Sequence, residues 1–341
     1  MKIVKYTLIG GGALVACELA GYFGLSAAAG MIRGKDMASH TELRSANEAP
    51  GLFELQANAD GSFRLAVFTD LHFDLFDPLG TIRAKLAMRK HIETRKPDMI
   101  AVLGDTALNP FNKGRTRAFV KLMDSFGIPW TAVLGNHEGE ADHIVPRREV
   151  LEYYGESSHF IGAAELPGVT GYGNQAVAVM DAEGACAHFL YFLDSGGGRG
   201  HNYIQEDQLA WMRAVAARHP GTPGMIFLHV PVYQYKDAYE ALETGEAQLL
   251  RGDLREGVCT MGTREQSDAL VARAKELGVH SIVCGHDHSN NFDILWQGIR
   301  YIYTQSGGYS WKCYDKRSKD ARGCSVYVIQ KDGGMELEQN F

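Results

Sequence analysis

The feature that most constrains the fold is an alternation of short apolar runs with amphipathic stretches from residue 64 onward. Residues 65–69 and 99–103 are apolar runs of strand length, and the helical periodicity between them ends at Pro97. This alternation is typical of strands connected by crossover helices and predicts an α/β fold. On the same grounds we predict a helix over 115–126 and further strands at 131–134, 176–180, 188–193, 225–228, 281–284, 301–304 and 325–329.

Five of the apolar runs are followed at once by residue types that bind metals. These residues are Asp70, His72, Asp105, Asn136, His229, His286 and His288. In open α/β sheets the carboxyl ends of strands line a common crevice, where residues distant in sequence can meet. Gly104, Gly135 and Gly285 stand where a strand turns sharply and the backbone comes close to a bound group. The pattern therefore predicts one metal-binding crevice.

The motifs D-x-H (70–72), G-D (104–105), G-N-H-E (135–138), H (229) and G-H-x-H (285–288) occur in this order. With them the chain resembles the calcineurin-like metallophosphoesterase superfamily, and the string YFLDSG at 191–196 is similar to bacterial and fungal relatives of purple acid phosphatases. The chain departs from purple acid phosphatases at Leu108, where they have a metal-binding tyrosine, and at His72, where they have glycine. The resemblance implies a four-layer α/β/β/α sandwich of two mixed sheets flanked by helices.

The resemblance also implies which residues share a metal ion. One ion would be held by Asp70, His72, Asp105 and His288, and the other by Asp105, Asn136, His229 and His286. Imidazole, carboxylate and amide ligands without thiolate suit Mn, Fe or Zn better than Ca. A metal-bridging hydroxide would then attack the phosphoester in line, with His137 as general acid and transition-state stabiliser. Glu138 and Asp287 are expected to orient neighbouring imidazoles.

These residues predict a phosphoester hydrolase acting on small phosphomonoesters. A phosphodiesterase for cyclic nucleotides or other diesters is an alternative, because relatives with the same ligand set do both. A metal-binding scaffold without turnover is a second alternative. The net charge of −7, with Lys and Arg scattered along the sequence, argues against binding of a nucleic-acid polymer.

The N-terminal region reads differently from the rest. Residues 7–29 contain one charge, Glu18, and follow a basic start, which predicts a signal peptide or membrane anchor over 1–30. Residues 31–62 would form a tether and 63–341 the catalytic domain, in an extracytoplasmic, secreted or membrane-anchored protein. Lipidation at Cys17, which ends a lipobox-like string, and a buried N-terminal helix are alternatives. The six cysteines show no C-x-x-C pair and do not fix the redox compartment.

Overall fold

The computed structural model describes residues 49–74, 76–107, 112–140, 145–197, 203–310 and 322–339. Its smaller sheet consists of β2 (Phe63–Phe68), β3 (Met99–Leu103), β4 (Trp130–Val133), β12 (Ser325–Ile329) and β13 (Met335–Gln339). These five strands lie in the order β13-β12-β2-β3-β4. The neighbours β2, β3 and β4 run parallel, so their carboxyl ends lie at the same end of the sheet.

The larger sheet has eight strands. They are β1 (Leu52–Gln56), β5 (Gln175–Met180), β6 (Cys186–Phe192), β7 (Gly224–Phe227), β8 (Ala247–Arg251), β9 (Val279–Cys284), β10 (Asp293–Trp296) and β11 (Ile299–Tyr303). Their order is β1-β5-β6-β7-β9-β11-β10-β8, and the central strands β6, β7, β9 and β11 are parallel. Both sheets are therefore mixed, with parallel strands at their centres.

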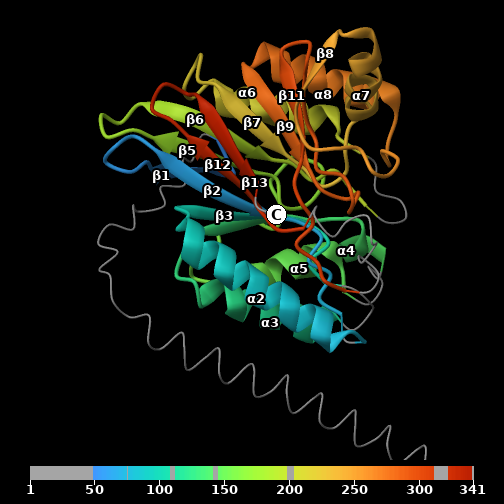
Figure 1. Cartoon of the computed structure of the whole chain (residues 1–341). Helices are drawn as coiled ribbons and strands as arrows, with labels where there is room; N and C mark the ends of the chain where they lie inside the picture. Colours follow the sequence, from blue (N-terminus) through green and yellow to red (C-terminus); the bar gives the residue numbers. More distant parts are fainter. Residues whose placement is uncertain are drawn as a thin grey trace, which may run out of the picture.

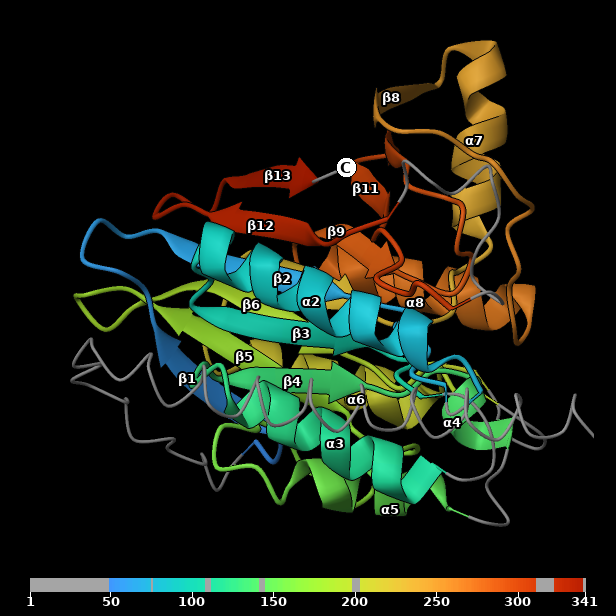
Figure 2. The same ribbon diagram turned by 60° about the horizontal axis from the view of Figure 1, so that its bottom comes forward.

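Helices cover the outer face of each sheet, which gives four layers (Figures 1 and 2). The helices α2 (Pro78–Arg95), α3 (Asn112–Asp124) and α5 (Arg147–Tyr154) pack on the five-stranded sheet. The helices α6 (Glu206–Ala216), α7 (Gln234–Thr244) and α8 (Arg264–Glu276) pack on the eight-stranded sheet. A third apolar cluster, including Leu65, Ala101 and Phe227, fills the space between the two sheets. The predicted four-layer sandwich is confirmed.

Local sequence signals explain the element nearest to the first motif. Helix α2 begins at Pro78, and the side chain of Asp77 caps it by accepting a hydrogen bond of 2.9 Å from the amide of Gly80. The helix ends at Arg95, and its C-cap, Lys96, takes a left-handed conformation directly before Pro97. The strand that follows, β3, is buried along its whole length because the other sheet covers one face and helices the other.

The start of the domain differs from the prediction. Residues 52–56, predicted as part of a tether over 31–62, form β1 and pair in parallel with β5, with Leu52 opposite Ala176. Leu52 is buried in the same core as α6, so burial of its side chain and the strand hydrogen bonds together hold this segment. Residues 1–48, which include the predicted signal or anchor, lie outside the described residues. No helix within the described ranges is long and apolar enough to cross a membrane.

Candidate metal centre

Five loops at the carboxyl ends of strands bring the seven predicted ligands together. Asp70 and His72 follow β2, Asp105 follows β3 and Asn136 follows β4, whereas His229 follows β7 and the pair His286 and His288 follows β9. The first three strands belong to one sheet and the last two to the other, so the centre lies where the two sheets meet. The ligand atoms of the six His and Asp residues form two groups that share Asp105, and within each group the atoms lie within 4.8 Å of one another. Asn136 joins the second group through its contact with His229.

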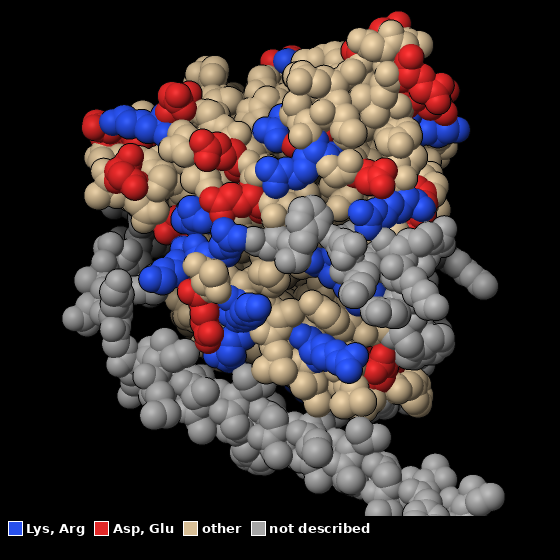
Figure 3. Space-filling model, viewed as in Figure 1, with Lys and Arg blue, Asp and Glu red and all other residues tan. Residues whose placement is uncertain are grey.

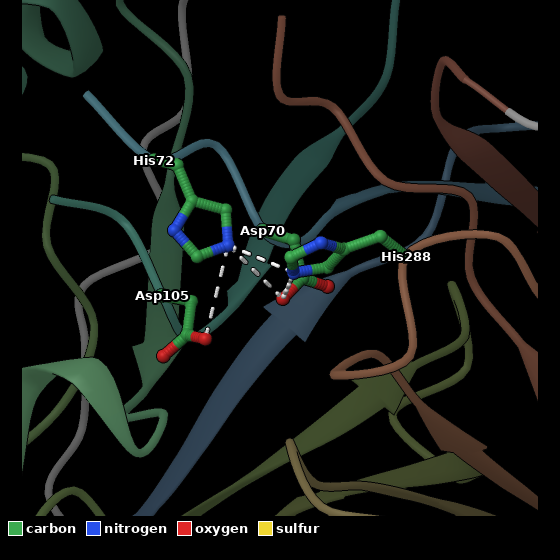
Figure 4. A group of neighbouring side chains, drawn as sticks. All are labelled: Asp70, His72, Asp105 and His288. Carbon is green, nitrogen blue, oxygen red and sulfur yellow. Dashed lines mark hydrogen bonds and ion pairs between the residues drawn. The ribbon is translucent and has the colours of Figure 1, made fainter. Parts of the chain in front are cut away.

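The first group consists of Asp70, His72, Asp105 and His288 (Figure 4). The Nε2 atoms of His72 and His288 are 2.9 Å apart. Asp70 Oδ1 lies 3.7 Å from the Nε2 of His72 and 3.4 Å from that of His288. Asp105 Oδ2 lies 3.9 Å from His72 Nε2. Two imidazole nitrogens and two carboxylate oxygens thus converge on one point.

The second group places His229 between its partners. His229 Nε2 lies 3.3 Å from Asp105 Oδ2, 3.1 Å from Asn136 Oδ1 and 3.3 Å from His286 Nδ1. The other ring nitrogen of His229, Nδ1, is 2.7 Å from the carbonyl oxygen of Leu103. Because a carbonyl can only accept, Nδ1 donates its proton to Leu103, so Nε2 is the ring atom that faces the metal position.

The residues present fit a bound cation. Asp70 Oδ2 is occupied by the amide of His286 at 3.0 Å and lies 2.8 Å from the hydroxyl of Thr69. Asp70 Oδ1 is buried and has no hydrogen-bond partner. Burying a carboxylate oxygen without a partner is costly, and a cation at the convergence point of the first group would remove that cost. The nitrogen and oxygen donor set suits Mn, Fe or Zn.

Electrostatics keep both carboxylates ionised. Burial alone would raise the pKa of Asp70, but the nearby imidazoles of His288 and His72 outweigh it and hold this pKa well below its usual range. At Asp105 burial is again outweighed, here by the charge of His229, and the pKa is lowered. Burial would lower the pKa of His229, yet its contact with Asp105 raises it to about 10. The centre therefore offers two buried negative charges to a cation.

The ligand loops have unusual backbone conformations. Asp70, His72, Asp105 and His286 have positive φ angles of 53°, 46°, 50° and 75°. Side-chain-bearing residues rarely adopt this region, and such strain persists at functional sites where the surroundings enforce it. At Gly135 a Cβ atom would lie 2.1 Å from Asp105 Oδ1, so only glycine lets the third loop approach the shared carboxylate.

His137 lies beside the two groups but belongs to neither. It opens the short helix α4 (His137–Glu140), and its amide donates a 2.9 Å hydrogen bond to Asp105 Oδ1. Its Nε2 is 3.8 Å from Asp105 Oδ2, and its ring contacts that of His72 edge-on. The side chain of His137 is 28% exposed, whereas that of Asp105 is 1% exposed. His137 therefore stands at the mouth of the centre.

Glu138 and Asp287, predicted to orient imidazoles, have other hydrogen-bond partners in the structure. Neither carboxylate has a hydrogen-bonded imidazole among the described residues. Glu138 accepts hydrogen bonds of 2.7–2.9 Å from the amides of Asp105, Thr106 and Gly135, so it ties two ligand loops together through their backbones. Asp287 accepts from the hydroxyl of Tyr303 and the amide of Cys259, and burial raises its pKa to about 7.

The structure adds a buried ion pair that the sequence analysis missed. Arg147 is fully buried, donates a 2.6 Å hydrogen bond to the carbonyl of Gly135 and pairs with Asp194. The sequence could have identified Asp194, because this residue follows an apolar strand as the predicted ligands do. The sequence could not have identified Arg147, since an arginine at the start of α5 is expected at the surface. His143 and His201, considered as residues overhanging the site, lie outside the described residues.

Comparisons with known proteins agree with this geometry. Residues 63–290 match the model of the family described as calcineurin-like phosphoesterase. The chain is 26% identical over 308 residues to "Probable inactive purple acid phosphatase 28" of Arabidopsis thaliana, covering 77% of this chain and 74% of the relative. It is 24% identical to "Phosphatase DCR2" of Saccharomyces cerevisiae, covering 71% of this chain and 46% of the relative. A dimetal phosphatase from Danio rerio has the same fold, with a TM-score of 0.51 and 14% identity over 81% of this chain and 95% of that one.

Proposed function

Because the chain belongs to the calcineurin-like phosphoesterase family, we propose that its metal centre hydrolyses small phosphomonoesters. The proposal depends on one observation, the two ligand groups that share Asp105 and so form a single centre for two cations. When bound, two metal ions would supply Lewis acidity to the phosphoryl oxygens and would acidify a water molecule.

Each of the two metal ions would be held by four side chains. We assign Asp70, His72, Asp105 and His288 to one ion, and Asp105, Asn136, His229 and His286 to the other. The set leaves open whether the ions are Mn, Fe or Zn. Two carboxylates neutralise only part of the charge of two such ions, so the occupied centre stays electropositive toward a phosphate dianion.

His137 is proposed as the residue that protonates the leaving oxygen and stabilises charge in the transition state. Its partial exposure at the mouth lets its ring reach a bound phosphoester. The backbone hydrogen bond from His137 to Asp105 fixes the start of α4 relative to the shared carboxylate. A ring held in this way can donate a proton without reorganising the centre.

An experiment can distinguish phosphomonoester hydrolysis from two other functions, those of a phosphodiesterase and of a non-catalytic scaffold. A phosphodiesterase would use the same ligands but accommodate a second ester group. A scaffold would bind metal without turnover, and the word "inactive" in the name of the Arabidopsis relative makes this test necessary. Against the scaffold stands the convergence of all seven predicted ligands in this chain.

The test uses the full chain stripped of metal by a chelator and reloaded separately with Mn, Fe or Zn. Rates are measured with p-nitrophenyl phosphate and bis(p-nitrophenyl) phosphate. We expect reloading to restore hydrolysis and kcat/KM to favour the monoester by about tenfold or more, a difference of about 1.4 kcal/mol in transition-state binding. A reversed preference would make the protein a phosphodiesterase. Two bound metals without turnover on a broad phosphoester panel would make it a scaffold.

For the N-terminal segment we propose export or membrane anchoring through residues 7–29, whose apolar length is close to that of a bilayer span. The proposal rests on composition alone. Mass spectrometry of the mature protein from soluble and membrane fractions tests it, because cleavage, lipidation at Cys17 and retention of the whole segment give different masses. An intact, unmodified chain found only in the soluble fraction would contradict it.

A further inference from the structure

Helix α2 carries apolar and cationic side chains together on its outward face. Leu79 and Leu86 are 53% and 52% exposed, and Phe76, just before the helix, is 73% exposed. Arg83 and Lys90 are exposed as well. The spacing of three or four residues between positions 79, 83, 86 and 90 places them along one side of the helix. We call Phe76, Leu79, Arg83, Leu86 and Lys90 the α2 face.

The apolar members of the α2 face are not needed for the core. The opposite side of the helix, with Ala84, Met88 and Ile92, already packs on the five-stranded sheet. A single exposed leucine is ordinary on a protein surface. Exposed apolar residues that recur at helical spacing are instead typical of a surface that contacts another apolar phase.

The charge around the α2 face is opposite to that of the whole chain. Residues 78–96 and 112–124 contain ten cationic and two acidic side chains, a formal charge of +8 in a protein of −7. The cations are Arg83, Lys85, Arg89, Lys90, Arg95, Lys96, Lys113, Arg115, Arg117 and Lys121. The two helices are neighbours, because Arg89 donates to the hydroxyl of Ser125 just after α3. Figure 3 shows blue side chains over this part of the molecule.

Several of these cations are neutralised locally, but those of the α2 face are not. Lys113 and Arg117 pair with acidic residues, as does Arg95 with Glu338. Arg83 and Lys90 have no ion-pair partner within the described part of the chain. Lys and Arg are spread along the whole sequence, but the packing of α2 beside α3 brings ten of them together near the α2 face.

We propose that the α2 face docks on an anionic lipid surface. A phosphate backbone would attract its cations but would leave Phe76, Leu79 and Leu86 in water. A lipid interface satisfies both, since lipid headgroups attract the cations and the acyl boundary accepts the apolar side chains. Residues 7–29, proposed above for export or membrane anchoring, would as a retained anchor provide a second contact with the same membrane and raise the effective concentration of the α2 face at its surface. Helix α2 starts six positions after His72, so docking would hold the metal centre close to that surface.

The test measures burial of the α2 face directly by hydroxyl-radical footprinting of the full chain with excess vesicles. Vesicles of phosphatidylcholine are compared with vesicles containing phosphatidylglycerol. We expect oxidation of Phe76, Leu79 and Leu86 to fall about threefold or more only with the anionic lipid. Leu249 and Leu250 on β8, 45% and 42% exposed, serve as internal controls and should not change. Protection should vanish at about 1 M salt, where charges are screened beyond about 3 Å.

Matched variants separate docking from other causes. Arg83→Glu with Lys90→Glu should abolish the protection, whereas Lys236→Glu with Lys331→Glu makes the same change in net charge at exposed sites elsewhere and should preserve it. Equal rates with p-nitrophenyl phosphate would show that both variants are folded. Protection that is equally strong without anionic lipid, or that survives charge reversal, would mean that another part of the chain or a second copy covers the α2 face, and would overturn the proposal.

Discussion

The metal centre beyond the carboxyl end of β9 and a second histidine pair at its amino-terminal end have nearly the same geometry between two imidazoles. In the centre the Nε2 atoms of His72 and His288 are 2.9 Å apart, with ring planes inclined by 71°. At the amino-terminal ends of β6 and β9, the Nε2 atoms of His188 and His280 are 2.8 Å apart, also with an inclination of 71°. The two pairs lie roughly 20 Å apart along the strands.

The surroundings of the two pairs are what differ. His72 and His288 face Asp70 and Asp105, whereas among the described residues no third His, Cys, Asp or Glu completes a metal-binding group with His188 and His280. Burial and the neighbouring His280 lower the pKa of His188 to about 3, so this distant pair is neutral. At His288 burial acts in the same direction, but Asp70 outweighs it and raises the pKa. Imidazole geometry alone thus does not define a metal site, and the buried carboxylates do.

Removal of the shared carboxylate, Asp105, should have the largest effect on the difference between the two histidine pairs. Asp105→Asn keeps the shape but takes one charge from both ligand groups, so we expect metal content and hydrolysis to fall together by about a hundredfold or more in affinity and rate. Metal analysis after dialysis and a p-nitrophenyl phosphate assay measure both. The control is His188→Gln, which should change neither. Full metal content in Asp105→Asn would contradict the assignment of this residue as the bridge.

A second test asks whether every imidazole at the carboxylate-rich end is a ligand. His137→Ala should keep both metals and lose about 10²–10⁴ in kcat, because it removes a proton donor but leaves all seven proposed ligands in place. The effect should shrink for p-nitrophenyl phosphate compared with an alkyl phosphate, since p-nitrophenolate leaves without protonation. Equal losses for both substrates would point to positioning of Asp105 rather than proton transfer.

The third test concerns the buried charges that support the centre. Arg147→Met leaves Asp194 unpaired and removes the donor to the Gly135 carbonyl, so we expect a loss of about 3–5 kcal/mol in the free energy of unfolding. The adjacent Arg148 is 57% exposed and pairs only at the surface, and Arg148→Met should cost less than about 0.5 kcal/mol. Urea unfolding of the two variants makes the comparison. Similar losses would mean that the ion pair is not what stabilises this loop.

The sequence predicted the centre well because its signals are local. Each ligand directly follows an apolar strand, and a parallel arrangement brings such strand ends together whatever the connecting loops do. Asp70 and His286 could therefore be assigned without knowing how far apart their strands lie. The nine predicted strand positions between 65 and 329 were recognisable because their apolar runs are continuous, whereas β8 (Ala247–Arg251) and β10 (Asp293–Trp296) were not predicted.

The features that were not predicted depend on contacts between residues that a sequence pattern does not reveal. Strand β1 mixes polar and apolar residues, and only its pairing with β5 makes it part of the sheet. Glu138 was recognised as part of a motif, but its partners are backbone amides of another loop, which residue type does not reveal. The positive charge around the α2 face emerges only when α2 and α3 pack side by side. Arg147 contradicts the expectation that arginine lies at the surface.

The smallest expected effect concerns the distant pair, His188 and His280, and the dependence of stability on pH. Burial lowers the pKa of His280 to about 4, with a contribution from Arg300 on β11. In the unfolded chain these histidines bind protons below pH 6.5. In the folded chain the pair, packed beside Cys186 on β6, stays neutral to a lower pH. Stability from this pair is therefore complete above pH 6.5 and is lost as the pH falls toward 4.

His280→Gln should remove part of that loss, because glutamine can still bond to His188 but does not titrate. We expect unfolding free energy to fall by about 2 kcal/mol less between pH 7 and pH 4.5 than in the unmodified chain, measured by urea titration with the same metal loaded. His219→Gln makes the same chemical change at a half-buried histidine outside the pair and should follow the unmodified curve. If the His280→Gln curve also follows it, the distant pair does not resist protonation, and carboxylates would not be the main difference between the two ends of the sheet.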